Sequence, residues 1–214
     1  MEIGPVILFL GENGREASMS QSVRAILVCS TGLVAGCLTG ERPNLDKTDL
    51  VQPGGLAGSY EATLHAGPQQ GPTMPLRIVG QDDGSYLAYL TENGKEDPPE
   101  LMRILDLKPD TQVVVLENPN SPDQIAEFGI LARGSNGNWQ VSILDIAETS
   151  RNDTLKPIVQ RHGAEVEFHH GLGNATDDRL KGTLTADQLR TLYSDPDFLA
   201  ATKNLMTIEL APKP

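Results

Sequence analysis

Residues 75–94 read PLRIVGQDDGSYLAYLTENG, and this stretch predicts the fold class of the chain. Short runs of alternating apolar and polar residues flank Asp82-Asp83-Gly84, and a period of two is typical of a β-strand with two different faces. Gly84 can adopt the positive φ that a tight turn between two strands needs. The stretch therefore predicts a β-hairpin, which is an antiparallel pair of strands.

The same pattern recurs on both sides of this hairpin. It is found in SYEATLHA (59–66), LMRILDL (101–107), TQVVVLE (111–117) and AEFGILARGSNGNWQVSILDI (126–146). Pro109 presets φ for a turn between the second and third of these segments, and Asn136-Gly137 predicts a turn within the fourth. The pattern predicts about seven strands in sequence, mostly joined by short turns. This arrangement is typical of an antiparallel meander and not of a βαβ array.

The last third of the chain changes to helical signals. Three segments predict short helices: Asp153–Gln160 with Gly163 after it, a helix begun by the capping box Thr185–Gln188, and a helix begun by Asp195-Pro196. Two segments predict strands: AEVEFHH (164–170) and the closing MTIEL (206–210). The predicted fold class is therefore α+β, mainly an antiparallel β-meander followed by two or three short helices and a closing strand.

The charge of the chain restricts its partners. The 214 residues carry a net charge of −12, and no cluster of five or more Lys and Arg residues occurs among them. Nucleic-acid-binding proteins use such clusters, because neutralising phosphates supplies most of the non-specific affinity. The sequence therefore predicts that nucleic acid is not a partner, and it argues against a polybasic lipid-binding face.

The start of the chain contains the apolar run ILVCSTGLVAGC (26–37). The run is diluted by glycine and hydroxyl residues and is shorter than the roughly 20 residues of a spanning helix. A basic flank at Arg24, an apolar body over residues 25–34 and the small pair Ala35-Gly36 are typical of a secretory signal peptide.

The residues around the expected cut are more specific. Leu33-Val34-Ala35-Gly36-Cys37 resembles the lipobox of bacterial lipoproteins, in which an aliphatic residue and two small residues precede an obligatory Cys. The resemblance implies a diacylglycerol on the Cys37 thiol, cleavage between Gly36 and Cys37, and acylation of the new amino terminus. Three acyl chains would make a lasting anchor, since each buried CH₂ contributes about 0.8 kcal/mol. Residues 1–18 contain three glutamates that do not belong in a signal peptide, so Met19 is the expected start.

This interpretation divides the chain into three parts. Residues 1–36 are the signal peptide, residues 37–55 are a flexible tether, and residues 56–214 are one β-rich domain. The tether is expected because TGERPNLDKTDLVQPGG (39–55) is polar, turn-rich and without periodicity. Leu38 stands where the enterobacterial sorting rule has Asp for inner-membrane retention. The outer membrane, with the domain facing the periplasm, is therefore favoured over the inner membrane.

The one cluster of candidate metal ligands comprises His162, His169, His170 and Asp177. Imidazole and carboxylate groups suit zinc or another divalent cation. However, the spacing differs from HExxH, and adjacent histidines on a strand point to opposite faces. The favoured interpretation is a polar strand end and loop. No nucleophile elbow and no phosphate-binding loop occur, so the sequence predicts no catalytic residues and no cofactor.

Three function classes remain. The favoured class is a membrane-tethered envelope lipoprotein that acts as a binding or assembly module on an unknown envelope protein or ligand. The plan of lipobox, tether, meander and late helices resembles small uncharacterised proteobacterial lipoproteins, and this resemblance implies no activity. The first alternative is a tethered hydrolase or metal-dependent enzyme. The second is a cytosolic acidic interaction protein, in which PVILFL (5–10) and AILV (25–28) pair as strands.

Overall fold

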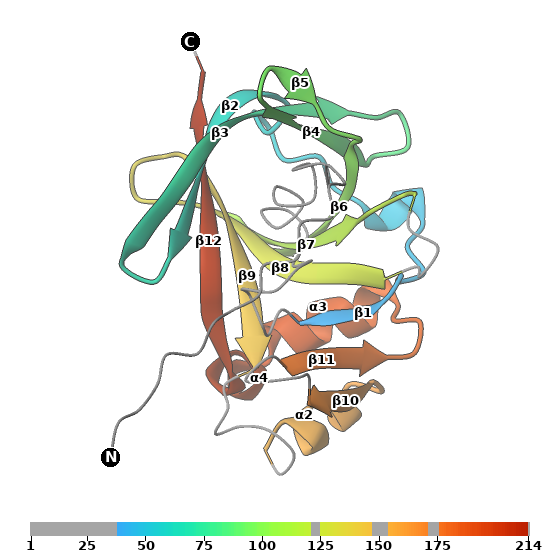
Figure 1. The fold of residues 1–214 in the computed structure, drawn as a ribbon. Coiled ribbons are helices and arrows are strands. Elements are labelled where there is room, and N and C mark those ends of the chain that lie inside the picture. Colours follow the sequence, from blue (N-terminus) through green and yellow to red (C-terminus); the bar gives the residue numbers. More distant parts are fainter. Residues whose placement is uncertain (1–37, 121–124, 147–153, 171–175, 214) are drawn as a thin grey trace, which may run out of the picture.

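The computed structural model describes residues 38–120, 125–146, 154–170 and 176–213. Within these ranges, eight antiparallel strands close into a barrel (Figure 1). The strands are β2 (Gly58–Ala66), β3 (Gln69–Gly80), β4 (Tyr86–Glu92), β6 (Glu100–Lys108), β7 (Thr111–Glu117), β8 (Ile125–Arg133), β9 (Trp139–Ile146) and β12 (Thr202–Pro212). The short strand β5 (Lys95–Glu96) pairs with β4 outside the ring. The predicted antiparallel meander is confirmed, and its seven strands are β2 to β4 and β6 to β9.

The closing strand turns this meander into a barrel. β12 pairs with β2 on one side and with β9 on the other, while β8 pairs with β9. The turns are those that the sequence predicts: Gly84 and Gly137 have φ of 91° and 81°, and Asp110 follows Pro109 with φ of 64°. Two-residue periodicity then divides each strand between an inner and an outer face.

The inner faces form the first hydrophobic core. Every barrel strand contributes to it. One aromatic residue comes from each of β2, β4 and β9, and the other strands contribute aliphatic side chains. Its buried residues are Leu56, Tyr60, Ala62, Leu76, Ile78, Tyr86, Ala88, Leu90, Met102, Ile104, Val114, Leu116, Leu131, Trp139, Val141, Ile143, Met206, Ile208 and Leu210. The interior of a barrel of this size is typically filled by side chains of this kind.

A second hydrophobic core lies outside the barrel wall. Outward-facing residues of the wall, such as Val113, Val115 and Phe128, pack there against the segment inserted between β9 and β12. That segment contains α2 (Leu155–Arg161), β10 (Glu165–His170), β11 (Thr176–Lys181), α3 (Ala186–Ser194) and α4 (Pro196–Ala201). β7 is buried on both faces as a result, which explains its unbroken apolar run.

The helices begin where the sequence predicts. In the capping box of α3, the Gln188 backbone N–H donates to Thr185 Oγ1 at 3.3 Å, and Gln188 Oε1 accepts from the Thr185 backbone N–H at 3.0 Å. The Asp195 side chain caps α4, whose first residue is Pro196. α2 begins at Leu155, so Pro157 lies in its first turn, and Gly163 follows its end with φ of 71°. The expected cap Asp153 lies outside the described residues.

The expected flexible tether is wrong for the described residues 38–55, which pack against both cores. Leu38 is completely buried in the second core, and Leu56, at the other end of the segment, is completely buried in the first. Between them, β1 (Thr39–Glu41) pairs with β8 and with β11, and η2 (Lys47–Asp49) forms one 3-10 turn. The segment lacks periodicity because its apolar residues serve two different cores in turn.

The residues just before β2 close one end of the barrel. Aromatic side chains of the first core donate to consecutive carbonyls there: Trp139 Nε1 to Gly55 at 3.0 Å and Tyr60 Oη to Gly55 and Leu56 at 2.9 and 2.8 Å. Arg133 donates to the Gly54 carbonyl and lies over the Trp139 ring, with its Cζ 3.8 Å from the ring centroid. Residues 51–56 therefore act as a lid fixed to several barrel strands. No helix among the described segments has the length and apolar character needed to cross a membrane.

Candidate functional site

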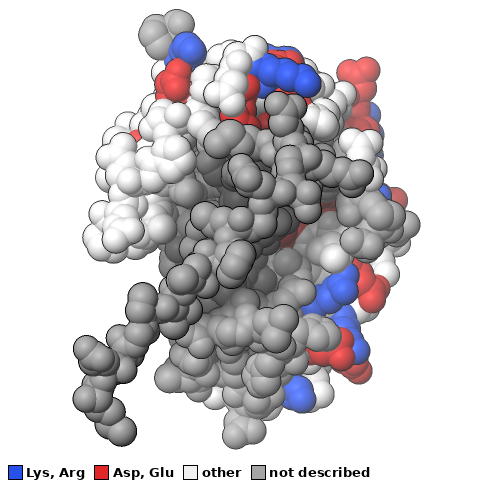
Figure 2. Space-filling model, viewed as in Figure 1, with Lys and Arg blue, Asp and Glu red and all other residues white. Residues whose placement is uncertain are grey.

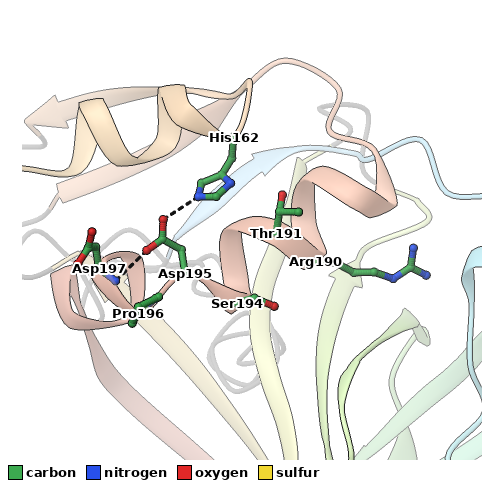
Figure 3. Close-up of a pocket in the computed structure, with 7 residues that line it drawn as sticks. All are labelled: His162, Arg190, Thr191, Ser194, Asp195, Pro196 and Asp197. Carbon is green, nitrogen blue, oxygen red and sulfur yellow. Dashed lines mark hydrogen bonds and ion pairs between the residues drawn. The ribbon is translucent and has the colours of Figure 1, made fainter.

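A surface pocket of about 560 Å³ lies where the end of α2 meets the junction of α3 and α4. Figure 3 shows its lining residues, which are His162, Arg190, Thr191, Ser194, Asp195, Pro196 and Asp197. They come from two parts of the insertion that are 28 or more residues apart in the chain. The sequence presents His162 as a weak candidate metal ligand and Asp195-Pro196 as a helix start, and it does not place them together.

His162 and Asp195 form the closest polar contact in this pocket. His162 is the C-cap of α2, and its Nε2 lies 2.7 Å from Asp195 Oδ2. Arg161 joins the pair, since its Nη2 donates to Asp195 Oδ2 at 3.1 Å and to Asp197 Oδ2 at 3.0 Å. The other oxygen of Asp195 accepts the Asp197 backbone N–H at 2.8 Å, which is the cap of α4. One carboxylate therefore both caps α4 and holds the end of α2.

The electrostatics of this cluster favour an ionised carboxylate. The hydrogen bond from His162 is the main cause that lowers the pKa of Asp195 below its ordinary value; burial opposes it, and the Asp197 N–H and the charge of Arg161 add to the lowering. The side chains of Asp195 and His162 are 11% and 19% exposed. The imidazole is thus held in place with one ring nitrogen engaged.

The lining residues supply only part of a hydrolytic site. A His–Asp pair of this kind orients an imidazole for general-base catalysis when a nucleophile lies within hydrogen-bond reach. In Figure 3 the Ser194 side chain points away from His162. Thr191 Oγ1 donates to the carbonyls of Asp187 and Gln188 at 2.9 and 3.1 Å. The geometry therefore supports a clamp between α2 and the α3–α4 junction.

The four candidate metal ligands fall in two places. His162 faces Asp195, as described above. In the backbone register of β10 and β11, His169 lies opposite Asp177, and His170 lies opposite Thr176. The side chains of His169, His170 and Asp177 lie outside what the structure describes, so the favoured interpretation of a polar strand end and loop stays a prediction. Among the described side chains, no group of three His, Cys, Asp or Glu residues is placed to hold a metal ion.

A second polar cluster surrounds Glu117, whose side chain is fully buried at the end of β7. Arg103 Nε donates to Glu117 Oε1 at 2.7 Å, and Arg42 Nε lies 2.6 Å from Glu117 Oε2. Arg103 Nη2 also contacts the Glu117 carboxylate and donates to the Pro43 carbonyl at 3.3 Å. This cluster ties the chain after β1 to the outer barrel wall, and its two guanidinium groups compensate the one buried carboxylate.

The predicted lipidation and cleavage residues, Cys37 and Gly36, lie outside the described residues. Leu38, the next residue, is held by its own backbone: its N–H donates to the Leu144 carbonyl at 3.0 Å, and its carbonyl accepts from the Phe128 N–H at 3.3 Å. The described part of the fold therefore begins one residue after the expected anchor.

No local sequence pattern predicts the pairing of His162 with Asp195, because the two residues are 33 positions apart. Only His162, as a weak candidate metal ligand, and the Asp195-Pro196 helix start were visible as separate signals. Comparison of the chain with protein-family models, with curated proteins and with solved structures gave no match.

Proposed function

We propose that the chain is an envelope lipoprotein, anchored in the membrane through Cys37, whose barrel acts as a binding or assembly module. The observation that carries this proposal is the lipobox resemblance at residues 33–37, together with the burial of the residue that follows it. The lipobox resemblance places the new amino terminus at Cys37, and Leu38 is already a core residue of the barrel domain. Cleavage of the Gly36–Cys37 bond would therefore leave the described fold whole.

The fold supports a binding or assembly role through the barrel's exterior. Its interior is occupied by buried apolar side chains from every strand, and its wall is closed by antiparallel pairs. Such a barrel is a rigid support whose outer surface and loops carry recognition. We place the domain in the periplasm, on the outer membrane, because Leu38 stands at the sorting position. An envelope protein or ligand is the proposed partner, and nucleic acid is not.

Metabolic labelling tests the anchor. In a host that processes lipoproteins, the wild-type chain should incorporate radiolabelled palmitate and leave the membrane only in detergent. Cys37→Ser should abolish the label, whereas Cys29→Ser should retain it, because Cys29 lies within the removed segment. A wild-type chain found in the cytosol with the residues before Cys37 intact would refute the proposal and favour the cytosolic interaction protein.

Membrane location needs a separate measurement. Density separation of the two membranes should place the labelled chain in the outer-membrane fraction. The usual test of sorting, an Asp after the lipidated Cys, is confounded here because Leu38 is completely buried. Leu38→Asp would place a charge in the second core and unfold the domain, so fractionation of the wild type is the cleaner measurement.

A second candidate, a tethered hydrolase, has one specific observation in its favour. The His162–Asp195 pair in the pocket is half of a general-base arrangement. If it were catalytic, a screen of ester and amide substrates would give an activity that His162→Gln abolishes. Activity that is absent from the wild type, or that survives in His162→Gln, would remove this candidate and leave the binding module.

A further inference from the structure

We propose that the lipid anchor is joined to the barrel without a tether, so that the region around Leu38 on the barrel wall lies against the phospholipid headgroups. The inference rests on the lipid anchor proposed above and adds the orientation of the domain and a second contact surface, the headgroup layer itself. It reverses the sequence-based expectation of a mobile linker.

Leu38 cannot act as the start of a spacer. Its side chain is completely buried in the second core, and both of its backbone polar groups are paired across the split where β8 leaves β9. The next residues are held on two sides, because β1 lies between β8 and β11. A central strand frees its residues only when both neighbouring pairings break.

Close packing at Gly40 also holds β1 in place. A Cβ at Gly40 would lie 2.7 Å from the Phe128 ring and 3.1 Å from the Leu180 carbonyl oxygen. The backbone of β1 therefore approaches its neighbours more closely than any side chain would allow. Residues 38–41 are therefore tightly packed and do not form a linker.

The short distance between Cys37 and Leu38 also keeps the domain close to its anchor. Consecutive Cα atoms are about 3.8 Å apart, so a lipid on Cys37 is attached about one residue length from Leu38. A free segment as long as residues 38–55 would instead span up to about 60 Å when extended. With a free segment of that length, the domain would move at a distance from the membrane. With direct attachment at Leu38, the domain lies against the membrane surface.

The strands near Leu38 carry charged side chains of both signs. Partly exposed Lys181 forms an ion pair with Glu167 at 2.8 Å. At the lower right of Figure 2, where β1, β10 and β11 lie in Figure 1, Lys and Arg side chains occur beside Asp and Glu. Mixed charge of this kind suits contact with headgroups and opposes insertion into hydrocarbon.

Quenching of a site-attached fluorophore tests the orientation. The processed chain has Cys37 as its one cysteine, and acylation blocks that thiol, so one introduced cysteine accepts the dye alone. Glu41→Cys places the dye on the exposed last residue of β1, and Lys95→Cys places it on exposed β5, beyond the opposite wall. In vesicles of phosphatidylethanolamine and phosphatidylglycerol doped with a headgroup-linked quencher, the Glu41 site should lose most of its fluorescence and the Lys95 site should keep most of it.

A matched variant carries a glycine-serine insertion, as long as residues 38–55, between Cys37 and Leu38. It should remain lipidated and in the vesicle fraction. In this variant, the dye at position 41 should be quenched no more than the dye at position 95. Equal quenching of the two sites in the protein without the insertion would overturn the inference while the anchor stands. Absence of the lipid on Cys37 would instead overturn the proposed function, so the two failures are distinguishable.

Discussion

At the residue scale, Tyr193 presents an unusual polar atom in an apolar place. Its side chain is completely buried between α3, α4 and the barrel wall, its ring meets Phe198 edge-on at 5.2 Å, and its hydroxyl has no hydrogen-bond partner among the described residues. Burial raises the pKa of Tyr193, so the phenol stays neutral. A buried hydroxyl without a partner costs about 1–3 kcal/mol.

Removing that hydroxyl should therefore stabilise the protein. We expect Tyr193→Phe to increase the free energy of unfolding by about 1 kcal/mol, as measured by urea denaturation, because the ring contacts are kept and the desolvated group is lost. Phe198→Leu is the control for the ring contact and should lower stability. A destabilised Tyr193→Phe would mean that the hydroxyl is satisfied in solution.

Asp195 predicts a pH dependence at the same scale. Its folded-state pKa lies below the ordinary value of about 3.9, mainly because His162 donates to it. A carboxylate of this kind stabilises the fold fully above its unfolded pKa, and the contribution is lost as the pH falls through the folded pKa. Stability should therefore decline below about pH 4, and less steeply in Asp195→Asn.

Asp195→Asn is an informative variant because Asn also caps helices. Urea denaturation at a series of pH values from neutral to acidic separates the two roles of the side chain. Asp195→Asn should lose the contribution of Asp195 to the pH dependence and keep the cap, while Asp195→Ala should lose both. Parallel pH profiles for wild type and Asp195→Asn would show that the His162 and Arg161 contacts do not hold this carboxylate ionised.

At the scale of the element, the lid of residues 51–56 is held by Leu56 and by the aromatic donors beneath it. Leu56 is completely buried among first-core side chains, so Leu56→Ala should cost about 3 kcal/mol of unfolding free energy, within the range for a buried Leu. Leu64→Ala, at a partly buried position against the same core, is the matched control and should cost clearly less. Equal losses in urea denaturation would indicate that the lid is not part of the cooperative fold.

At the scale of the whole molecule, the two cores are joined by the segment that precedes β2. Leu38 packs in the second core, Arg42 pairs with the buried Glu117, and Leu56 packs in the first core. A chain that starts at Cys37 should therefore be more stable than one that starts at Leu56, and we expect a difference of at least about 3 kcal/mol from the loss of buried Leu38 and the β1 pairings.

Circular dichroism and urea denaturation of the two chains measure this difference. Both should give a strand-dominated spectrum if they fold, and the longer chain should unfold in one transition at the higher urea concentration. Coincident midpoints would contradict the assignment of residues 38–55 to the cooperative fold. A helix-dominated spectrum of the longer chain would contradict the barrel itself.

The sequence by itself determined the features that depend on neighbouring residues. Two-residue periodicity marked seven barrel strands, because alternate side chains on a strand face opposite sides whatever the strand pairs with. Gly84 and Gly137 marked turns through their positive φ, and Thr185 and Asp195 marked helix starts through side chains that cap the adjacent N–H groups. The lipobox resemblance is local in the same way, and it remains a prediction because Cys37 lies outside the described residues.

Only the tertiary structure decided the features that join distant residues. Closure of the barrel depends on β12 reaching both β2 and β9, and the second face of β7 is buried only because the insertion folds back over it. The clamp of His162 and Asp195 joins two helix ends that carry separate local signals. Residues 38–55 resembled a linker because their apolar side chains pack first in the second core and then in the first, so no period runs through the segment. Local patterns record the backbone geometry of a segment, whereas these contacts depend on which surfaces the whole fold brings together.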